Sequence, residues 1–478
     1  MTGSAARRTR TTKIVATVGP ASWDRQTLER LLLAGVNIVR INAAHNPIDE
    51  RLELVRTIRA AAQATGQHVG ILQDLAGPKP RTGPLPDGES VTLRQGELIQ
   101  LTTGDDPLAP DRISIDDPDL VAALRPGQRV LMADGLIELI VVAREGTGAT
   151  ARVVRGGRLR GKQGVTVPGA PAPPRTLTPA EAADIAFAAE HGLEYLGVSF
   201  VTAPGDITMV RDELRRRGGR AAIVAKIERP EALRAIHDVT QVADAVMVAR
   251  GDLGVQLAPE EVPIAQKRII AVARTHGKPV IIATQMLESM TTQPIPTRAE
   301  TSDVANAVID GVDAVMLSAE TATGRYPVEA VAMMDRIARA VEAEFPCGPG
   351  PGALRPDTIA STIARTASDI ARRSPLVDLI AVVTRSGFSA LEVARERPSV
   401  PVVAVTNSQF VANQLGLVWG VTPLVMAFPD DTEALISQAG AALIAAGHAR
   451  PGMHALFVGS LIVYHEPGHT DVLHLRRL

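Results

Sequence analysis

The stretch AIVAKIE, residues 222–228, is a short apolar run that ends in a lysine and a glutamate. Its small and β-branched residues favour a buried β-strand, and the charged pair marks the end of that strand. A similar run at 245–248 leads into Arg250 and Asp252. Short apolar strands that alternate with helical stretches are typical of a parallel sheet, whose carboxyl ends lie at one edge. We therefore expect Glu228 and Asp252 to be neighbours.

The same alternation extends along most of the chain. Eight strands are predicted, at 13–18, 37–41, 69–72, 195–199, 222–227, 245–248, 280–283 and 314–317. Stretches rich in Ala, Leu and Arg separate most of them and favour helices. This pattern predicts a (β/α)8 TIM barrel rather than an open sheet, and in such barrels the active site lies where the strands end.

Two regions depart from the alternation. Short β segments replace helices at 90–93, 97–101, 129–132, 136–142 and 149–154, and the pairs Asp134-Gly135 and Gly156-Gly157 predict hairpin turns there. A Gly/Pro-rich linker follows Cys347, and apolar strands at 379–383, 400–405 and 455–458 predict a smaller α/β domain. The expected domains are a disordered end at 1–10, the barrel at 11–83 and 174–345, an inserted small β-barrel domain at 84–173, and a C-terminal α/β regulatory domain at 346–478.

Composition narrows the class of protein. Fifty basic and 52 acidic residues give a formal net charge of −2, which offers no global attraction for nucleic acid or an anionic membrane. One cysteine excludes an internal disulfide framework. Neither a cleavable signal nor a run of 18 or more apolar residues is present. We expect a cytoplasmic enzyme with no nucleic-acid or membrane partner.

Polar residues follow most of the predicted barrel strands, as an active site requires. They are Arg40 and Asn42, Asp74, Lys226 and Glu228, Arg250 to Asp252, Thr284 and Gln285, and Ser318 to Glu320. Taken singly, Glu228 and Asp252 have an alternative as solvated loop carboxylates. On neighbouring strand ends they form the sparse oxygen ligand set that Mg²⁺ or Mn²⁺ prefers.

Lys226 and Glu228 stand two residues apart on a strand, so their side chains point to the same side. The apolar residues before Lys226 predict that it is buried, and a buried cation needs an anionic partner. The segment 250–254, RGDLG, begins a helical stretch whose free N–H groups and glycines suit a carboxylate ligand. A tight turn without a ligand is the alternative.

Several segments together resemble the pyruvate kinase family. They are TKIVATVGPAS at 12–22, KIE at 226–228, 249–255, ATQMLESM at 283–290, PTRAE at 296–300, 302–308 and 316–323. The inserted domain and the C-terminal domain follow in the family's order, so the resemblance covers nearly the whole chain. It implies a Mg²⁺-dependent transfer of the phosphoryl group of phosphoenolpyruvate to ADP, with release of pyruvate and ATP.

The resemblance also implies roles for individual residues. Glu228 and Asp252 would hold the divalent ion, Lys226 would stabilise the enolate, and Arg40 would hold the phosphoryl group. Thr284, with Gly251 and Asp252, would seat the substrate carboxylate near the route of proton delivery. The positions matched to the nucleotide side are Asn42, His45, Arg81 and Lys162. A homotetramer is implied as well.

The sequence departs from the family at its monovalent-cation site. Asn42 and Asp74 remain, but Ala44 and Leu75 stand where the family has Ser and Thr. Lys79 stands where K⁺-dependent members carry Glu. We expect the Lys79 ammonium to replace the monovalent cation, so that K⁺ is not required.

Other departures lie in the two smaller domains. The family's lysine before Gly-Val falls on Gln163, with Lys162 one position early, and Ala133 replaces an acidic residue beside Asp134. These changes affect the nucleotide side. In the C-terminal domain the loop at 384–389, TRSGFS, resembles the family's sugar-phosphate effector loop. Its candidate phosphate ligands for a sugar-phosphate or nucleotide effector are Thr384, Ser386, Gly387 and Ser389; an ordinary polar loop is the alternative.

Two further functions fit parts of the pattern. A metal-dependent pyruvate or phosphoenolpyruvate aldolase also needs a carboxylate-held ion beside an enolate, but it has no need of a nucleotide lid. A catalytically silent metabolite sensor would fit the substitutions at Ala44, Leu75 and Gln163. The presence of Lys226 with both carboxylates and Thr284 argues for the enzyme.

Overall fold

Eight parallel strands form a closed barrel in the order β1-β16-β15-β14-β13-β12-β3-β2. The computed structural model describes residues 10–43, 47–77, 79–86, 89–170, 175–346, 348, 358–460 and 469–478. The barrel strands are β1 (Lys13–Thr17), β2 (Ile38–Asn42), β3 (Gly70–Asp74), β12 (Tyr195–Val198), β13 (Ala222–Ile227), β14 (Ala245–Ala249), β15 (Val280–Ala283) and β16 (Ala314–Leu317). All eight predicted strands are confirmed: three have the predicted ends, and the ends of the other five shift by one or two residues.

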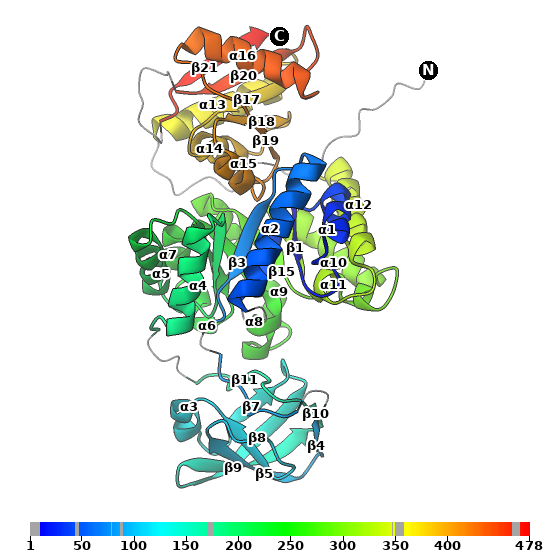
Figure 1. Cartoon of the computed structure of the whole chain (residues 1–478), viewed down its shortest axis with the longest axis vertical. Helices are drawn as coiled ribbons and strands as arrows, with labels where there is room; N and C mark the ends of the chain where they lie inside the picture. The colour runs from blue at the N-terminus through cyan, green and yellow to red at the C-terminus, as the bar shows by residue number, and fades with distance from the viewer. Residues whose placement is uncertain are drawn as a thin grey trace.

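Helices cover the outside of the barrel (Figure 1). They are α1 (Arg25–Ala34), α2 (Ile48–Thr65), α4 (Pro179–Glu190), α5 (Pro204–Arg216), α6 (Pro230–Arg234), α7 (Ile236–Val242), α8 (Arg250–Gln256), α9 (Glu261–His276), the 3₁₀ helix η1 (Glu288–Thr291), α10 (Arg298–Ile309), α11 (Ala319–Ala322) and α12 (Pro327–Glu344). Local signals set several boundaries. Thr178 and Glu181 form a capping box at the start of α4, and Gly277 ends α9 in the left-handed conformation.

Between β3 and α4 the chain leaves the barrel and forms a β-rich insert. Its elements are β4 (Val91–Leu93), β5 (Leu98–Thr103), β6 (Arg112–Ile115), α3 (Pro118–Ala123), β7 (Arg129–Met132), β8 (Ile137–Glu145), β9 (Gly148–Arg155), β10 (Gly157–Leu159) and β11 (Val165–Thr166). Six of the strands form one sheet in the order β11-β7-β8-β9-β5-β6, and β10 pairs with β4. The insert lies beyond one end of the barrel (Figure 1).

One of the two predicted hairpin turns in the insert is confirmed. Asp134 and Gly135 connect the antiparallel strands β7 and β8, with φ of 53° and 84°. The hairpin expected at Gly156-Gly157 is wrong, because β10 leaves β9 and pairs with β4 instead. Gly156 is needed for that crossing, since a Cβ there would lie 2.2 Å from the carbonyl oxygen of Leu93.

The C-terminal domain holds a five-stranded sheet in the order β19-β18-β17-β20-β21. Its elements are α13 (Ile359–Arg373), β17 (Leu379–Val383), α14 (Phe388–Arg395), β18 (Val402–Thr406), α15 (Gln409–Leu415), β19 (Val421–Val425), α16 (Thr432–Ala445), β20 (His454–Gly459) and β21 (Val472–Arg477). The three predicted strands are present; β19 and β21 were not predicted. No helix of the described residues has the length and apolar character needed to cross a membrane.

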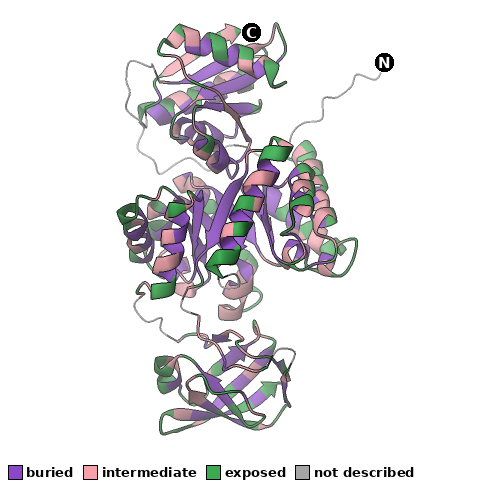
Figure 2. Ribbon diagram, viewed as in Figure 1, coloured by how far each residue is buried: buried purple, intermediate pink, exposed green. Residues whose placement is uncertain are grey.

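The barrel strands are buried on both faces (Figure 2). One set of alternate residues packs against the helices, and the other set, which includes Ile38, Leu72 and Val224, fills the barrel interior. Because side chains alternate along a strand, the residues two positions later also point inward. The barrel interior is therefore apolar towards the amino ends of the strands and polar at their carboxyl ends.

The C-terminal domain docks on the opposite, amino end of the barrel. The hydroxyl of Tyr195 donates to the carbonyl of Gln414, and Lys13 donates to the carbonyl of Val421 over 2.7 Å. Arg10 is anchored at the same end, because its guanidinium pairs with Asp335 at 2.8 Å. The expectation of a disordered end through residue 10 is therefore wrong for Arg10, and residues 1–9 lie outside the described part of the chain.

Lys13 makes the stability of this junction depend on pH. Burial, with a smaller contribution from the charge of Arg10, lowers the pKa of Lys13 from 10.5 to about 7. Between these values the unfolded chain binds the extra proton, so the free energy of unfolding rises with pH. We therefore compare the free energies of unfolding of the parent and of a Lys13→Met variant. Their difference, parent minus variant, should rise by about 3 kcal/mol between pH 7 and about 9.5, at about 1.4 kcal/mol per pKa unit.

Denaturant unfolding of both proteins at several pH values measures this difference. Lys267→Met, which removes an exposed lysine, is the matched control and should give a flat difference. A flat difference for Lys13→Met as well would contradict the prediction.

Candidate active site

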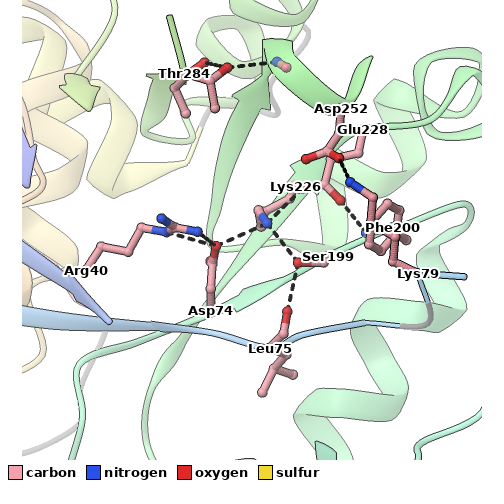
Figure 3. A network of polar contacts seen from close by, with 12 residues as sticks. Arg40, Asp74, Leu75, Lys79, Ser199, Phe200, Lys226, Glu228, Asp252 and Thr284 are labelled. Atoms are coloured by element: carbon pink, nitrogen blue, oxygen red, sulfur yellow. Dashed lines mark hydrogen bonds and ion pairs between the residues drawn. The ribbon is translucent and has the colours of Figure 1, made fainter. Parts of the chain in front are cut away.

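Four polar side chains meet inside the carboxyl end of the barrel. Arg40 follows Ile38, Asp74 follows Leu72 and Lys226 follows Val224, each two residues after an apolar residue of the interior. Ser199 lies four residues after Tyr195, directly after the end of β12. The pleat of the strands thus brings side chains from four neighbouring strands into one layer (Figure 3).

The Asp74 carboxylate is shared by two cations. Its Oδ2 accepts from Arg40 Nε at 2.9 Å and Nη2 at 2.6 Å, and it lies 3.1 Å from Lys226 Nζ. Burial by itself would raise the pKa of Asp74, but Arg40 and Lys226 hold it below its usual value. Gly197 leaves the space for this carboxylate, because a Cβ there would lie 2.0 Å from Asp74 Oδ1. Asp74 is therefore ionised and fixes both cations.

Lys226 is a buried ammonium with two carboxylate partners. Its Nζ lies 2.7 Å from Glu228 Oε1 and donates to Ser199 Oγ over 2.8 Å. Burial by itself would lower the pKa of Lys226, but the charges of Asp74 and Glu228 raise it well above its ordinary value. The expectation that Lys226 and Glu228 point to the same side is confirmed. A permanently charged ammonium at this depth is suited to stabilising an anion.

Glu228 and Asp252 form an acidic pair beside Lys226 (Figure 3). Glu228 is 1% exposed, and its Oε2 accepts from the backbone N–H of Phe200 over 2.7 Å. Burial raises the pKa of Glu228, and the Asp252 charge raises it further, against the effect of Lys226. Glu228 Oε1 has an ion pair but no hydrogen bond in the described structure. Two such carboxylates favour a bound cation.

The donor set fits a magnesium-type ion. Among the described residues no group of three or more His, Cys, Asp or Glu side chains converges. Mg²⁺ is commonly held by one or two carboxylates, with substrate oxygens and waters completing its coordination. Glu228 and Asp252 provide that partial set.

Lys79 lies on the outer side of this acidic pair. Its ammonium donates to Asp252 Oδ1 over 2.6 Å, lies 3.5 Å from Asp134 of the insert, and faces the Phe200 ring at 5.9 Å. Burial by itself would lower the pKa of Lys79, but the charge of Asp252 raises it. The lysine thus places a fixed positive charge against an expected metal ligand.

Thr284 and Gly251 meet as the sequence predicted. Thr284 has a φ of 70° and Gln285 a φ of 56°, which are strained values for residues with side chains. Arg250 holds this turn, because its Nη2 donates to the carbonyls of Thr284 and Gln285 over 2.6 and 3.1 Å. The Gly251 N–H donates to Thr284 Oγ1 over 2.8 Å. The turn therefore places a hydroxyl and a helix amino end side by side.

The residues expected on the nucleotide side are only partly brought together. Arg81 and Lys162 lie near the base of the insert, where Arg81 Nη1 donates to the carbonyl of Lys162 over 3.1 Å. His45 lies outside the described residues. A cleft of about 910 Å³ separates the insert from the barrel and is lined by Asp134, Gly251 and other residues of both. Its lining includes neither Arg81 nor Lys162.

Sequence reasoning missed two features of this site. Ser199 was assigned to a strand end without a role, although its spacing from Tyr195 already placed it in the barrel interior. Asp74 was assigned to a monovalent-cation remnant, whereas it is the common partner of Arg40 and Lys226. That pairing joins β2, β3 and β13, and no spacing in the sequence indicates it.

Comparisons with known proteins give the family of the chain. A model of the pyruvate kinase barrel domain matches residues 9–331, and a model of the pyruvate kinase alpha/beta domain matches residues 361–475. The pyruvate kinase of Methylorubrum extorquens is 39% identical over 475 residues, or 98% of each chain. The chain belongs to the pyruvate kinase family. The pyruvate kinase of Mycobacterium tuberculosis is also similar, at 38% identity over 473 residues, 98% of this chain and 99% of that one.

Membership of the pyruvate kinase family makes the chain a phosphotransferase. The matched barrel model spans every candidate residue from Arg40 to Thr284. Two of the positions expected to depart from the family pattern lie among the described residues. Leu75 lies buried beside Asp74, and Lys79 pairs with Asp252. Ala44 lies outside the described residues.

Neutralising Asp74 should damage both stability and turnover. In an Asp74→Asn variant Arg40 and Lys226 keep their charges without the shared carboxylate, and breaking a buried pair costs about 3–5 kcal/mol. We expect a loss of that size in the free energy of unfolding and at least a tenfold fall in turnover, about 1.4 kcal/mol.

Asp310→Asn is the control, since Asp310 pairs with Lys267 at the surface and such pairs contribute about 0–1 kcal/mol. Equal losses in the two variants, measured by denaturant unfolding, would show that Asp74 is not the common counterion.

Proposed function

We propose that the chain is a Mg²⁺-dependent pyruvate kinase that transfers the phosphoryl group of phosphoenolpyruvate to ADP and releases pyruvate and ATP, the last step of glycolysis. The main support is a chain of ion pairs at the carboxyl end of the barrel. Arg40 pairs with Asp74 at 2.6 Å, Asp74 with Lys226 at 3.1 Å, and Lys226 with Glu228 at 2.7 Å. It supports the assignment because two fixed cations stand beside an acidic pair, in the place where barrel enzymes bind their substrates.

The transfer leaves an enolate and moves a charged phosphoryl group, so catalysis consists mainly of positioning and charge stabilisation. Lys226 would stand against the enolate oxygen, and Arg40 would hold the phosphoryl group. The Gly251 N–H and Thr284 hydroxyl would receive the substrate carboxylate. When bound, a Mg²⁺ held by Glu228 and Asp252 would neutralise charge on substrate oxygens.

The charges of the site support a polyanionic substrate. Three cations, Arg40, Lys226 and Lys79, are matched by three carboxylates, Asp74, Glu228 and Asp252. A divalent ion added to this balanced set leaves an excess of positive charge. Phosphoenolpyruvate, with a phosphate and a carboxylate, is attracted by such an excess, which is strengthened where water is excluded.

We infer that the enzyme does not need K⁺. Lys79 supports this inference, because its ammonium forms an ion pair with Asp252 and supplies one fixed positive charge at the edge of the site. Leu75 lacks the hydroxyl of the family pattern, and its backbone carbonyl already accepts a hydrogen bond from Ser199 Oγ.

We also propose an anionic effector, such as a sugar phosphate, at the loop between β17 and α14. Gly387 has a φ of 85°, and its N–H donates to Thr384 Oγ1 over 2.9 Å. This hydrogen bond holds the loop in a tight turn. Ser389 Oγ lies 2.7 Å from Thr470 Oγ1 at the other end of the domain's chain. A homotetramer is part of the same proposal, on the family resemblance alone.

Two other functions make different predictions. A silent sensor would bind phosphoenolpyruvate without turnover, and an aldolase would act without ADP. The presence of Lys226 and Arg40 together with the acidic pair of Glu228 and Asp252 favours the kinase, because a sensor has no need to stabilise an enolate.

Release of pyruvate from phosphoenolpyruvate and ADP tests the function directly. We expect turnover that requires Mg²⁺ and falls at least a hundredfold, about 2.7 kcal/mol, in a Lys226→Met variant, because the enolate then lacks its buried ammonium. Binding of phosphoenolpyruvate without turnover in the parent, across nucleoside diphosphates and sugar-phosphate effectors, would instead support the sensor.

Turnover in K⁺ and in tetramethylammonium buffers of equal ionic strength tests the role of Lys79. The parent should be equally active in both, because its cation is covalently attached. A Lys79→Met variant should lose at least tenfold, about 1.4 kcal/mol, in both buffers. An absolute K⁺ requirement of the parent would refute this role.

A further inference from the structure

Ser199 is a junction between Lys226 and the two segments that connect the insert to the barrel. Its Oγ accepts from Lys226 Nζ over 2.8 Å and donates to the backbone carbonyl of Leu75 over 2.8 Å (Figure 3). Its own backbone carbonyl accepts from Arg175 Nη1 over 2.6 Å. One residue therefore contacts the catalytic ammonium, the segment that enters the insert, and the segment that returns from it.

Arg175 is itself firmly held. It is the first described residue after the insert, and its guanidinium also pairs with Glu181 in the first turn of α4. The two side chains are only 3% and 2% exposed. Glu181 is itself held by the capping box with Thr178. A buried, doubly engaged arginine has little freedom to move independently of Ser199.

The entry segment is held against the same strand end. Leu75 N–H donates to the carbonyl of Gly197 over 2.9 Å. Gly77 packs on the next residue of β12's exit, because a Cβ there would lie 2.7 Å from the Phe200 ring. The Phe200 N–H in turn donates to Glu228. The entry segment thus contacts Ser199 and Phe200, Arg175 contacts Ser199, and these two residues contact Lys226 and Glu228.

We propose that Ser199 and Arg175 are positioning residues that couple the placement of the insert to the Lys226 ammonium. The coupling rests on the proposed phosphoryl transfer, in which Lys226 stabilises the enolate. A displacement of Arg175 pulls on the Ser199 carbonyl, and the Ser199 side chain then reorients Lys226. Misplacement of a catalytic group by about 1 Å costs on the order of a hundredfold in rate, so small shifts are sufficient.

The first test compares two buried arginines that pair with the same helix. Arg175→Met removes the contacts with Ser199 and Glu181. Arg51→Met removes a buried ion pair of 2.7 Å with Asp184, also on α4, but does not touch Ser199. A purely structural role predicts similar losses of stability and unchanged kcat in both. Coupling predicts that kcat falls at least tenfold in Arg175→Met alone, with KM for phosphoenolpyruvate changed less than threefold.

The second test remains informative if Arg175→Met folds poorly. Ser199→Ala removes one oxygen and should lower kcat at least tenfold. It should also slow the exchange of pyruvate methyl protons with D₂O, an ADP-independent reaction that depends on enolate stabilisation. In the Arg175→Met and Ser199→Ala double variant the losses should be less than multiplicative, because both act through one path.

The outcomes separate this inference from the proposed function. A parent without turnover would overturn the function. A parent with Mg²⁺-dependent turnover, together with unchanged kcat and exchange in Ser199→Ala, would overturn the coupling alone. Multiplicative losses in the double variant would show that Arg175 acts independently of Ser199, which also contradicts the coupling.

Discussion

The site depends on one buried carboxylate. Asp74 is 1% exposed and holds Arg40 and Lys226, two cations that would otherwise repel each other inside the barrel. Taking charges out of water is costly unless they are paired, so the three side chains are stable there only as a set. Gly197 is part of the same constraint, because any side chain at that position would occupy the space of the carboxylate.

The positions of the acidic pair and of Lys79 depend on Arg40, Asp74 and Lys226. Lys226 is oriented by Asp74, Ser199 and Glu228, so its ammonium has a defined place beside the acidic pair. Lys79 then neutralises Asp252 from the side of the insert. Asp74 and Lys226 are buried, whereas Lys79 lies on the segment that leads into the insert.

The two ends of the barrel have different tasks. The carboxyl end holds the charged layer and the connections to the insert. The amino end is closed by the C-terminal domain through Lys13, Tyr195 and a buried Asp313, which accepts from the backbone of Val280 and pairs with Arg397. The loop at 384–389 belongs to this domain and so lies at the end of the barrel opposite the charged layer. β13 is one strand that runs from that interface, where Ala222 lies near Tyr195 and Gln414, to Lys226.

The sequence by itself determined the barrel, the polar strand ends and the identity of Arg40, Lys226, Glu228, Asp252 and Thr284, because strand periodicity and strand-end position are local properties of the chain. It also placed Lys226 and Glu228 on one side of a strand. Only the tertiary structure decided that Asp74 is shared, that Lys79 reaches Asp252, that Ser199 joins three segments, and that β10 leaves β9 for β4. These contacts join residues far apart in the chain, and their partners are set by strand order, barrel stagger and the close approach that glycines permit.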